Sequence, residues 1–448
     1  MDSASADKEN GAVDSPGQLD AGALFVLKSR GSWLHCGYHL TTSIVGPVIF
    51  SFPFALSLLG WAPGLVITAL QALLTFYSYN LLSLVLEYHA HLGKRQLRFR
   101  DMAADILGPR WGKYFVGPLQ IAICYGAVIS CILLGGQSLK VVHLLAVQSK
   151  WEDATVPVYN HLRNCTTNVG TDTILPFAET YQPCLSTPYP CLLRIGRRRF
   201  NTHRNAPNKD YSIQGSKENR ILGAINGISI IATTYGCGII PEIQATIAPP
   251  ARGKMFKGLC ICFGVIVITY FSVAISGYWA FGNQSQPTIL YNFMSETRIL
   301  LPTWFLLLTN IFTLVQLVAV TVVYLQPTNE IFEKWFANPR MDEFSARNVM
   351  PRLVLRSVSV IIATVFAAML PFFGDIMALF GAFGIIPLDF ILPMLLYNLT
   401  FKPSRKGILF WGNTLIAVAS SALVAMGALA SVRQIVLDAK TYHLFANM

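Results

Sequence analysis

A single carboxylate follows a glycine- and proline-rich interruption in one long apolar segment, residues 221–247. The interruption consists of Gly236, Cys237, Gly238 and Pro241. Glu242 comes directly after it. A carboxylate within a membrane is costly to bury, so such residues more often line a cavity or an ion path than face lipid. Glu242 is therefore a candidate for proton exchange, and the alternative is a kinked helix with Glu242 near the cytoplasmic interface.

A second apolar segment is interrupted in the same way. The first span begins near Cys36 and carries Gly46, Pro47 and Pro53 within an otherwise apolar run. Paired discontinuous helices are typical of a transporter binding site near the bilayer midplane. Free N–H groups at half-helix starts suit a carboxylate, and unwound carbonyls can hold an ammonium group or a cation. A zwitterionic amino acid carries both charges and fits such a site.

The composition indicates a polytopic membrane protein. Of 448 residues, 53% are hydrophobic and 13% charged, which is too apolar for a soluble enzyme. The net charge of +11 lies in short segments between apolar runs, without interleaved aromatic RNA-reading motifs, so it indicates topology and not nucleic-acid binding. The sequence contains no paired nucleophile, phosphate loop or metal-ligand cluster. We therefore predict neither an enzyme nor a protein with a cofactor or metal.

Nine apolar runs are long enough to cross a bilayer. The basic loop between the second and third runs places the N-terminus in the cytosol by the positive-inside rule. The predicted organisation is a disordered cytosolic tail over 1–30, three spans within 31–146, a Pro- and Arg-rich non-membrane loop over 147–220, six spans within 221–433 and a C-terminal tail over 434–448.

Other polar residues within the spans have weaker assignments. Gln137 follows a pair of glycines and indicates either close helix packing or a polar lining. Gln316 either lines the site or forms an interhelical hydrogen bond. Asp375 and Asp389 are expected to cap helices at the membrane interface.

Long strings along the chain resemble the plant amino acid/auxin permease family, most closely its GABA-transporter branch. These strings are GPVIFSFPFALSLLGW, DYSIQGSKENRILGAINGISIIATTYGCGIIPEIQATIAPPARGKMFKGLC, SVAISGYWAFGN, VVYLQPTNEIFE, FSARNV, LPFFGDIMALFGAFGIIPLDFILPMLLYNLTFKPS and VRQIVLDAKTYHLFAN. The resemblance covers about residues 30–146 and 209–448. It implies an all-α, LeuT-like fold of two inverted five-helix repeats plus an eleventh helix. It also implies proton-coupled uptake of amino acids or related compounds.

The resemblance also assigns the substrate-binding segments. They are the unwound parts of the two broken spans, Ser43, Ile44, Val45 and Gly46 in the first and Thr234, Tyr235, Gly236, Cys237 and Gly238 in the second.

Residues 147–208 depart from the family. The family carries its fourth and fifth helices there, so the first repeat is predicted to have three helices instead of five, and the fold to be incomplete with about nine. We interpret this segment as the product of an aberrant gene model or splice form.

The predicted function is proton-coupled import of amino acids, either GABA or neutral amino acids, by alternating access around the two broken helices. The predicted partners are the substrate, protons and the lipid bilayer of the plasma membrane. The alternative is a transport-inactive truncated variant that interacts with intact permeases.

Overall fold

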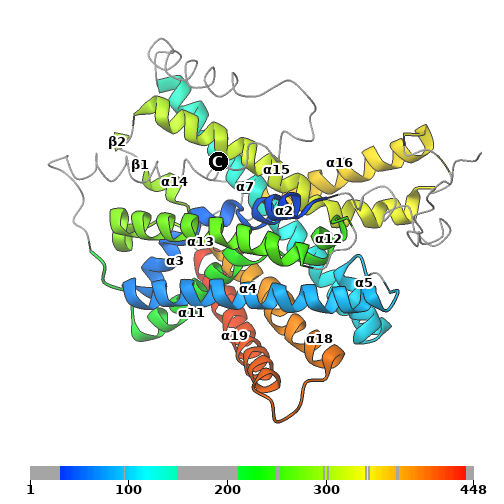
Figure 1. Ribbon diagram of the computed structural model, residues 1–448. Helices are drawn as coiled ribbons and strands as arrows, with labels where there is room; N and C mark the ends of the chain where they lie inside the picture. The colour runs from blue at the N-terminus through cyan, green and yellow to red at the C-terminus, as the bar shows by residue number, and fades with distance from the viewer. Residues whose placement is uncertain are drawn as a thin grey trace, which may run out of the picture.

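The computed structural model is almost entirely helical (Figure 1). The residues that it describes are 31–94, 96–148, 210–248, 253–295, 298–299, 302–338, 341, 344–369 and 373–439. A two-stranded antiparallel hairpin is formed by β1 (Met294–Ser295) and β2 (Arg298–Ile299).

Eight helices in the described part of the chain are long and apolar enough to cross a membrane, and a bent pair makes a ninth span. The bent pair is α2 (Trp33–Ile44) with η1 (Pro47–Ser51) and α3 (Phe52–Leu59). The other spans contain α4 (Trp61–His91), α7 (Gly117–Gln148), α11 (Lys217–Tyr235) with α12 (Ile240–Ala245), α13 (Lys254–Phe281), α15 (Thr303–Phe336), α16 (Ala346–Met369), α17 (Phe373–Phe380) with α18 (Leu392–Phe401), and α19 (Ile408–Ala439). The prediction of an all-α polytopic membrane protein is confirmed.

Both predicted breaks are present. The first span bends by 47° between α2 and η1, where Pro47 has no N–H to continue the helix. The second break separates α11 from α12. Pro241 occupies the first turn of α12, a position where its missing N–H leaves no helical bond unmade. Gly238 has φ +66°, a left-handed conformation that favours glycine.

Short elements connect the spans. They are α5 (Phe99–Ile106), α6 (Pro109–Trp111) and the π-helical η2 (Gly112–Val116) before α7, and η3 (Gly282–Gln284) and α14 (Ile289–Asn292) after α13. The sequence predicted one regular span over about residues 376–398. The structure instead has two π-helical stretches between α17 and α18, η4 (Gly381–Ile385) and η5 (Pro387–Ile391). Such wide turns are frequent at functional sites.

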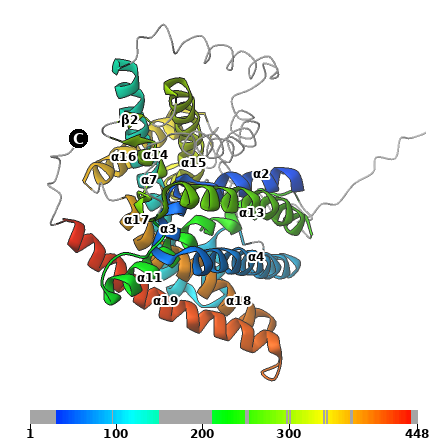
Figure 2. The same ribbon diagram turned by 90° about the vertical axis from the view of Figure 1, so that its left-hand side faces the viewer.

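The broken spans lie inside the bundle. Helix α13 packs along α2, and α11 packs along α3, while α7 runs through the middle with α15 beside it (Figure 2). Helix α19 lies at the periphery with α18. The central position of the breaks means that neighbouring helices, not lipid, surround their irregular backbone.

Two glycines allow α2 and α13 to approach closely. A methyl group added at Gly258 would lie 3.0 Å from Cys36 Sγ and 3.2 Å from the backbone nitrogen of Gly37. Small residues at such crossings let helix backbones pack in membranes. This contact fixes the first broken span against α13.

We therefore expect Gly258→Leu to destabilise the folded protein by about 1–3 kcal/mol, because the larger side chain must separate α2 from α13. Thermal unfolding of the detergent-solubilised protein measures the change. Gly264→Leu is the matched control, since Gly264 lies on the same helix and an added methyl group meets nothing within 4 Å among the described residues. Equal melting temperatures for the two variants would contradict this packing role.

Candidate functional site

The two breaks lie next to each other and share one hydroxyl group. Tyr270 of α13 is fully buried, and its Oη lies 2.8 Å from the carbonyl oxygen of Ile44 and 2.9 Å from that of Thr234. A phenolic hydroxyl has only one hydrogen to donate. The first break and the second therefore compete for, or share, the same donor.

Three further buried side chains donate to carbonyls of the unwound segments. Tyr324 Oη donates to Ser43 O at 2.8 Å, and Gln316 Nε2 donates to Val45 O at 2.8 Å. Tyr79 Oη lies 3.2 Å from Tyr235 O. Of the alternatives for Gln316, the structure shows the interhelical hydrogen bond, and it is made to the break itself.

Asp389 holds the second break from the opposite side. Its Oδ2 accepts from the backbone N–H of Cys237 at 3.0 Å and from Tyr79 Oη at 2.8 Å. The expectation that Asp389 caps a helix at the interface is wrong, because this residue is 0% exposed. The π-helical turns around Pro387 change the register of the helix, and ordinary helical periodicity does not predict where Asp389 points.

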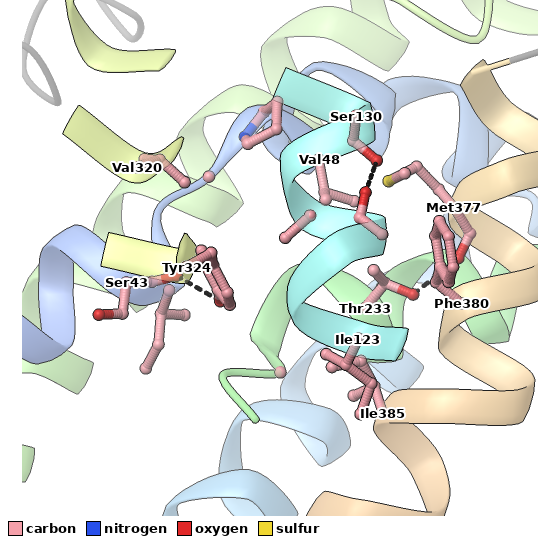
Figure 3. Close-up of a pocket in the computed structure, with 16 residues that line it drawn as sticks. Ser43, Val48, Ile123, Ser130, Thr233, Val320, Tyr324, Met377, Phe380 and Ile385 are labelled. Carbon is pink, nitrogen blue, oxygen red and sulfur yellow. Dashed lines mark hydrogen bonds between the residues drawn. The ribbon is translucent and has the colours of Figure 1, made fainter. Parts of the chain in front are cut away.

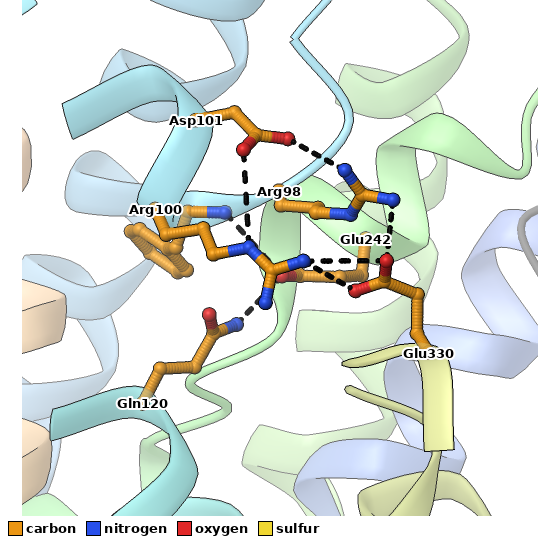
Figure 4. A network of polar contacts seen from close by, with 7 residues as sticks. Arg98, Arg100, Asp101, Gln120, Glu242 and Glu330 are labelled. Atoms are coloured by element: carbon orange, nitrogen blue, oxygen red, sulfur yellow. Dashed lines mark hydrogen bonds and ion pairs between the residues drawn. The ribbon is translucent and has the colours of Figure 1, made fainter. Parts of the chain in front are cut away.

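Glu242 is attached to the second break through a glutamine. Gln120 Nε2 lies 2.7 Å from Glu242 Oε1 and 3.2 Å from Gly238 O, and the N–H of Phe99 lies 3.3 Å from the same Oε1 (Figure 4). Glu242 is 8% exposed. It is therefore buried in the bundle, covered by the start of α5 at the end predicted to face the cytosol.

Ion pairs fasten α5 to α15 beside Glu242 (Figure 4). The Arg100 guanidinium lies 2.9 Å from Glu330 Oε2, and Arg98 contacts both Glu330 and, at 3.2 Å, Asp101. Arg98 is 6% exposed and Glu330 3% exposed, so these two partners are shielded from water, whereas the side chain of Asp101 is 37% exposed. Removing one partner of such a pair leaves a charge buried without compensation.

The sequence indicates a topology signal in this basic loop but does not predict the ion pairs. The partner Glu330 is 230 positions away from Arg100, so no local spacing connects them. Near the end of α5, Asp105 accepts a hydrogen bond at 3.0 Å from the ammonium group of Lys94, which lies in the loop before the helix. Lys94 and, with it, Gln96 lower the pKa of this exposed carboxyl below its ordinary value.

A cavity of about 40 Å³ lies between the two breaks and α7, α15 and α17 (Figure 3). This exceeds the ~15 Å³ that one buried water needs. Its lining includes four predicted site residues, Ser43, Ile44, Gly46 and Gly236. The polar residues Ser130, Thr233 and Tyr324 line it as well and were not predicted. Gln137 is not among the lining residues.

The other predicted site residues belong to the unwound backbone around this cavity. Val45, Thr234 and Tyr235 present the carbonyls described above, and Cys237 presents its N–H to Asp389. Gly238 offers its carbonyl to Gln120. In the described part of the chain, no group of three or more His, Cys, Asp or Glu side chains is arranged to hold a metal ion.

Two broken spans that meet at a buried cavity, within a bundle closed at one end by ion pairs, define a multi-pass membrane transporter. The sequence matches the family described as transmembrane amino acid transporter protein over residues 29–166 and 202–436. The chain belongs to this family, and it is an amino acid transporter and not an enzyme. The predicted resemblance is confirmed.

Two relatives from Arabidopsis thaliana match almost the whole chain. The protein named GABA transporter 1 is 52% identical over 435 residues, covering 96% of this chain and 96% of its own. Lysine histidine transporter-like 1 is 27% identical over 439 residues, covering 94% and 92%. A solved structure of a manganese transporter from Eremococcus coleocola is similar with a TM-score of 0.46 and 12% identity, over 91% of this chain and 95% of that chain.

The family match leaves residues 167–201 unmatched. The segment predicted to depart from the family and to replace two helices is 147–208, whereas the family match includes its two ends, 147–166 and 202–208. Residues 149–208 of that segment lie outside the described residues, as do the predicted tail over 1–30 and the last nine residues of the chain.

We expect Tyr270→Phe to lower the free energy of unfolding by about 1–3 kcal/mol, because carbonyls of both breaks then lose their buried donor. Tyr114→Phe serves as the control, since Tyr114 is 70% exposed and makes no hydrogen bond through its hydroxyl within the described structure. Melting temperatures of both purified variants measure the difference. An unchanged value for Tyr270→Phe would show that its hydroxyl does not hold the breaks.

Proposed function

We propose that this chain imports GABA or small neutral amino acids by proton-coupled transport, with alternating access around the two breaks. The observation that carries the proposal is the Tyr270 hydroxyl, which lies within hydrogen-bonding distance of carbonyls from both broken helices. A substrate that competes for these carbonyls would alter the contact between the two helices. Substrate binding and helix movement are then linked through one donor.

The proposed substrate site is the unwound backbone from Ser43 to Gly46 and from Thr234 to Gly238. Each carbonyl oxygen has two lone pairs. Ile44 O and Thr234 O, which share the single hydrogen of Tyr270, therefore keep capacity to accept from a substrate ammonium group. Backbone groups of this kind bind a charged substrate group without an oppositely charged side chain.

The character of the cavity supports a substrate with a neutral side chain. Its walls are mainly apolar, with Val48, Ile123, Val320 and Ile385 among them, and no charged side chain lines it within the described part of the chain. A cationic side chain would be desolvated there without a partner. The 52% identity to a protein named GABA transporter 1 agrees with this preference.

Release to the cytosol requires the closure formed by α5 to open. The Arg98 and Arg100 pairs with Glu330 and the cover that Phe99 forms over Glu242 all lie at this end. In the proposed cycle, Glu242 exchanges the proton with the cytosol when α5 moves away. Placement in the plasma membrane is part of the proposal.

We expect cells expressing this chain to take up labelled GABA faster at about pH 5.5 than at about pH 7.5, because a proton gradient drives a symporter. Initial uptake rates measure this difference, and surface biotinylation confirms that the protein is present. An excess of unlabelled neutral amino acids tests substrate range, while excess lysine should compete poorly.

Absence of uptake at both pH values, with the protein at the surface, would overturn the transport proposal for this chain. The unmatched residues 167–201 favour a second candidate in that case, a transport-inactive variant that associates with intact permeases. Co-purification with an intact family member, and reduced uptake by that member on co-expression, would support this second role.

Glu242→Gln should bring the ratio of uptake at the two pH values towards one, because the amide keeps the shape and the Gln120 contact but cannot release a proton. Glu87→Gln is the control, since Glu87 belongs to α4 near the same membrane end. Unchanged pH dependence in Glu242→Gln would remove this residue from the proton path.

A further inference from the structure

Asp389 is the most enclosed carboxyl group at the breaks, and one of its oxygens makes no hydrogen bond. The residue is 0% exposed, Oδ2 accepts from Tyr79 and Cys237, and the backbone N–H of Gly238 also interacts with the carboxylate. Oδ1 is buried and has no hydrogen-bond partner among the described residues. An unsatisfied oxygen of this kind in a native protein requires an explanation.

Among the residues that the structure describes, no cation compensates the charge of Asp389. The titratable groups that interact with it are Tyr79 of α4, Cys237 of the break and Tyr324 of α15. No ion pair within the described part of the chain includes Asp389. Carboxylates buried in membranes without a cation are rare and mark proton relays and ion pathways.

Asp389 is also in contact with the proposed substrate site. A methyl group added at Gly236, which lines the cavity, would lie 3.1 Å from Asp389 Oδ2. The neighbouring N–H of Cys237 is bonded to the same oxygen. A change at this carboxyl group therefore acts directly on the backbone that we propose to bind substrate.

We propose that Asp389 binds the transported proton beside the substrate site and that Tyr79 transmits its protonation state to the second break. This inference rests on the proposed function. In the step, one hydronium ion of the external solution gives its proton to Oδ1, which converts the carboxylate to a carboxylic acid and leaves a water molecule. The same proton leaves on the cytosolic side, so no oxidant, reductant or second reactant is involved.

The geometry of Tyr79 supplies the link between the proton and the helix. Its single hydrogen has two acceptors, Asp389 Oδ2 at 2.8 Å and Tyr235 O at 3.2 Å. A carboxylate is the stronger acceptor of the two, and a neutral carboxylic acid is a weaker one. Protonation of Asp389 thus shifts the Tyr79 hydrogen bond towards Tyr235 O, at the end of α11.

Asp389 and Glu242 act at separate steps of the proposed proton transfer. Asp389 bonds to the break at Cys237, whereas Glu242 connects to it through Gln120 and Gly238 O. The unwound segment lies between the two carboxyl groups. The proton binds at Asp389 together with the substrate and reaches Glu242 when the cytosolic side opens.

The test uses the full chain in proteoliposomes and separates GABA exchange from net proton-driven accumulation. Asp389→Asn imitates the protonated group, so we expect exchange of external for internal GABA to continue. In this variant, the ratio of GABA accumulated at about pH 5.5 to GABA accumulated at about pH 7.5 should fall to near one. Proton influx with GABA should disappear. Asp389→Glu restores a titratable carboxyl and should restore part of the ratio.

Asp105→Asn is the matched control, because Asp105 is a carboxylate paired with Lys94 outside the membrane spans. It should keep the wild-type ratio. Retention of the wild-type ratio and proton influx by Asp389→Asn would overturn the proposal while leaving the proposed transport function intact.

A second readout does not depend on transport or on the identity of the substrate. Infrared difference spectra between acidic and neutral pH should contain a carboxylic acid C=O band in wild-type protein that Asp389→Glu shifts and that Glu242→Gln retains. Loss of the wild-type band in Asp389→Asn completes the assignment. A band that is unchanged in both Asp389 variants would overturn it, even if the chain takes up no GABA.

Discussion

A peptide group inside a bilayer has no water to bond to, so each break in a membrane helix needs partners from the protein. This requirement organises the centre of the structure. The first break and the second together expose carbonyls from Ser43 to Val45 and at Thr234 and Tyr235, and buried side chains of α4, α13 and α15 donate to them. The helices around the site are thus positioned by the need to satisfy the unwound backbone.

The kind of partner matters as much as its presence. Tyr79 and Tyr270 each have one hydrogen and two acceptors within reach. A hydroxyl group in this situation can exchange one bond for another without leaving a buried donor unpaired, whereas losing a bond outright would cost about 1–3 kcal/mol. Both hydroxyls hold the second break, and Tyr270 holds the first break as well.

The sequence predicted the breaks because their causes are local. Pro47 and Pro241 cannot donate to a helix, and glycines stand beside both, so position alone indicates where the spans are interrupted. Glu242 is predictable for the same reason, because it follows Pro241 directly within an apolar segment. The number of spans also follows from the length of the apolar runs.

The partners could not be predicted, because they depend on tertiary contacts. Tyr79 and Tyr270 resemble ordinary aromatic residues of a span, and Asp389 lies in π-helical turns where the usual periodicity fails. Residues Arg98 and Arg100 carry the charge bias of a cytosolic loop, and only the folded chain brings them to Glu330. Charged groups pair at the membrane end that α5 covers, and in the proposed cycle the opening of α5 returns them to water. At the centre, hydroxyl and amide donors hold the carbonyls of the breaks, because a neutral donor needs no counter-ion when it is buried, and Asp389 is the carboxyl group that contacts the second break directly.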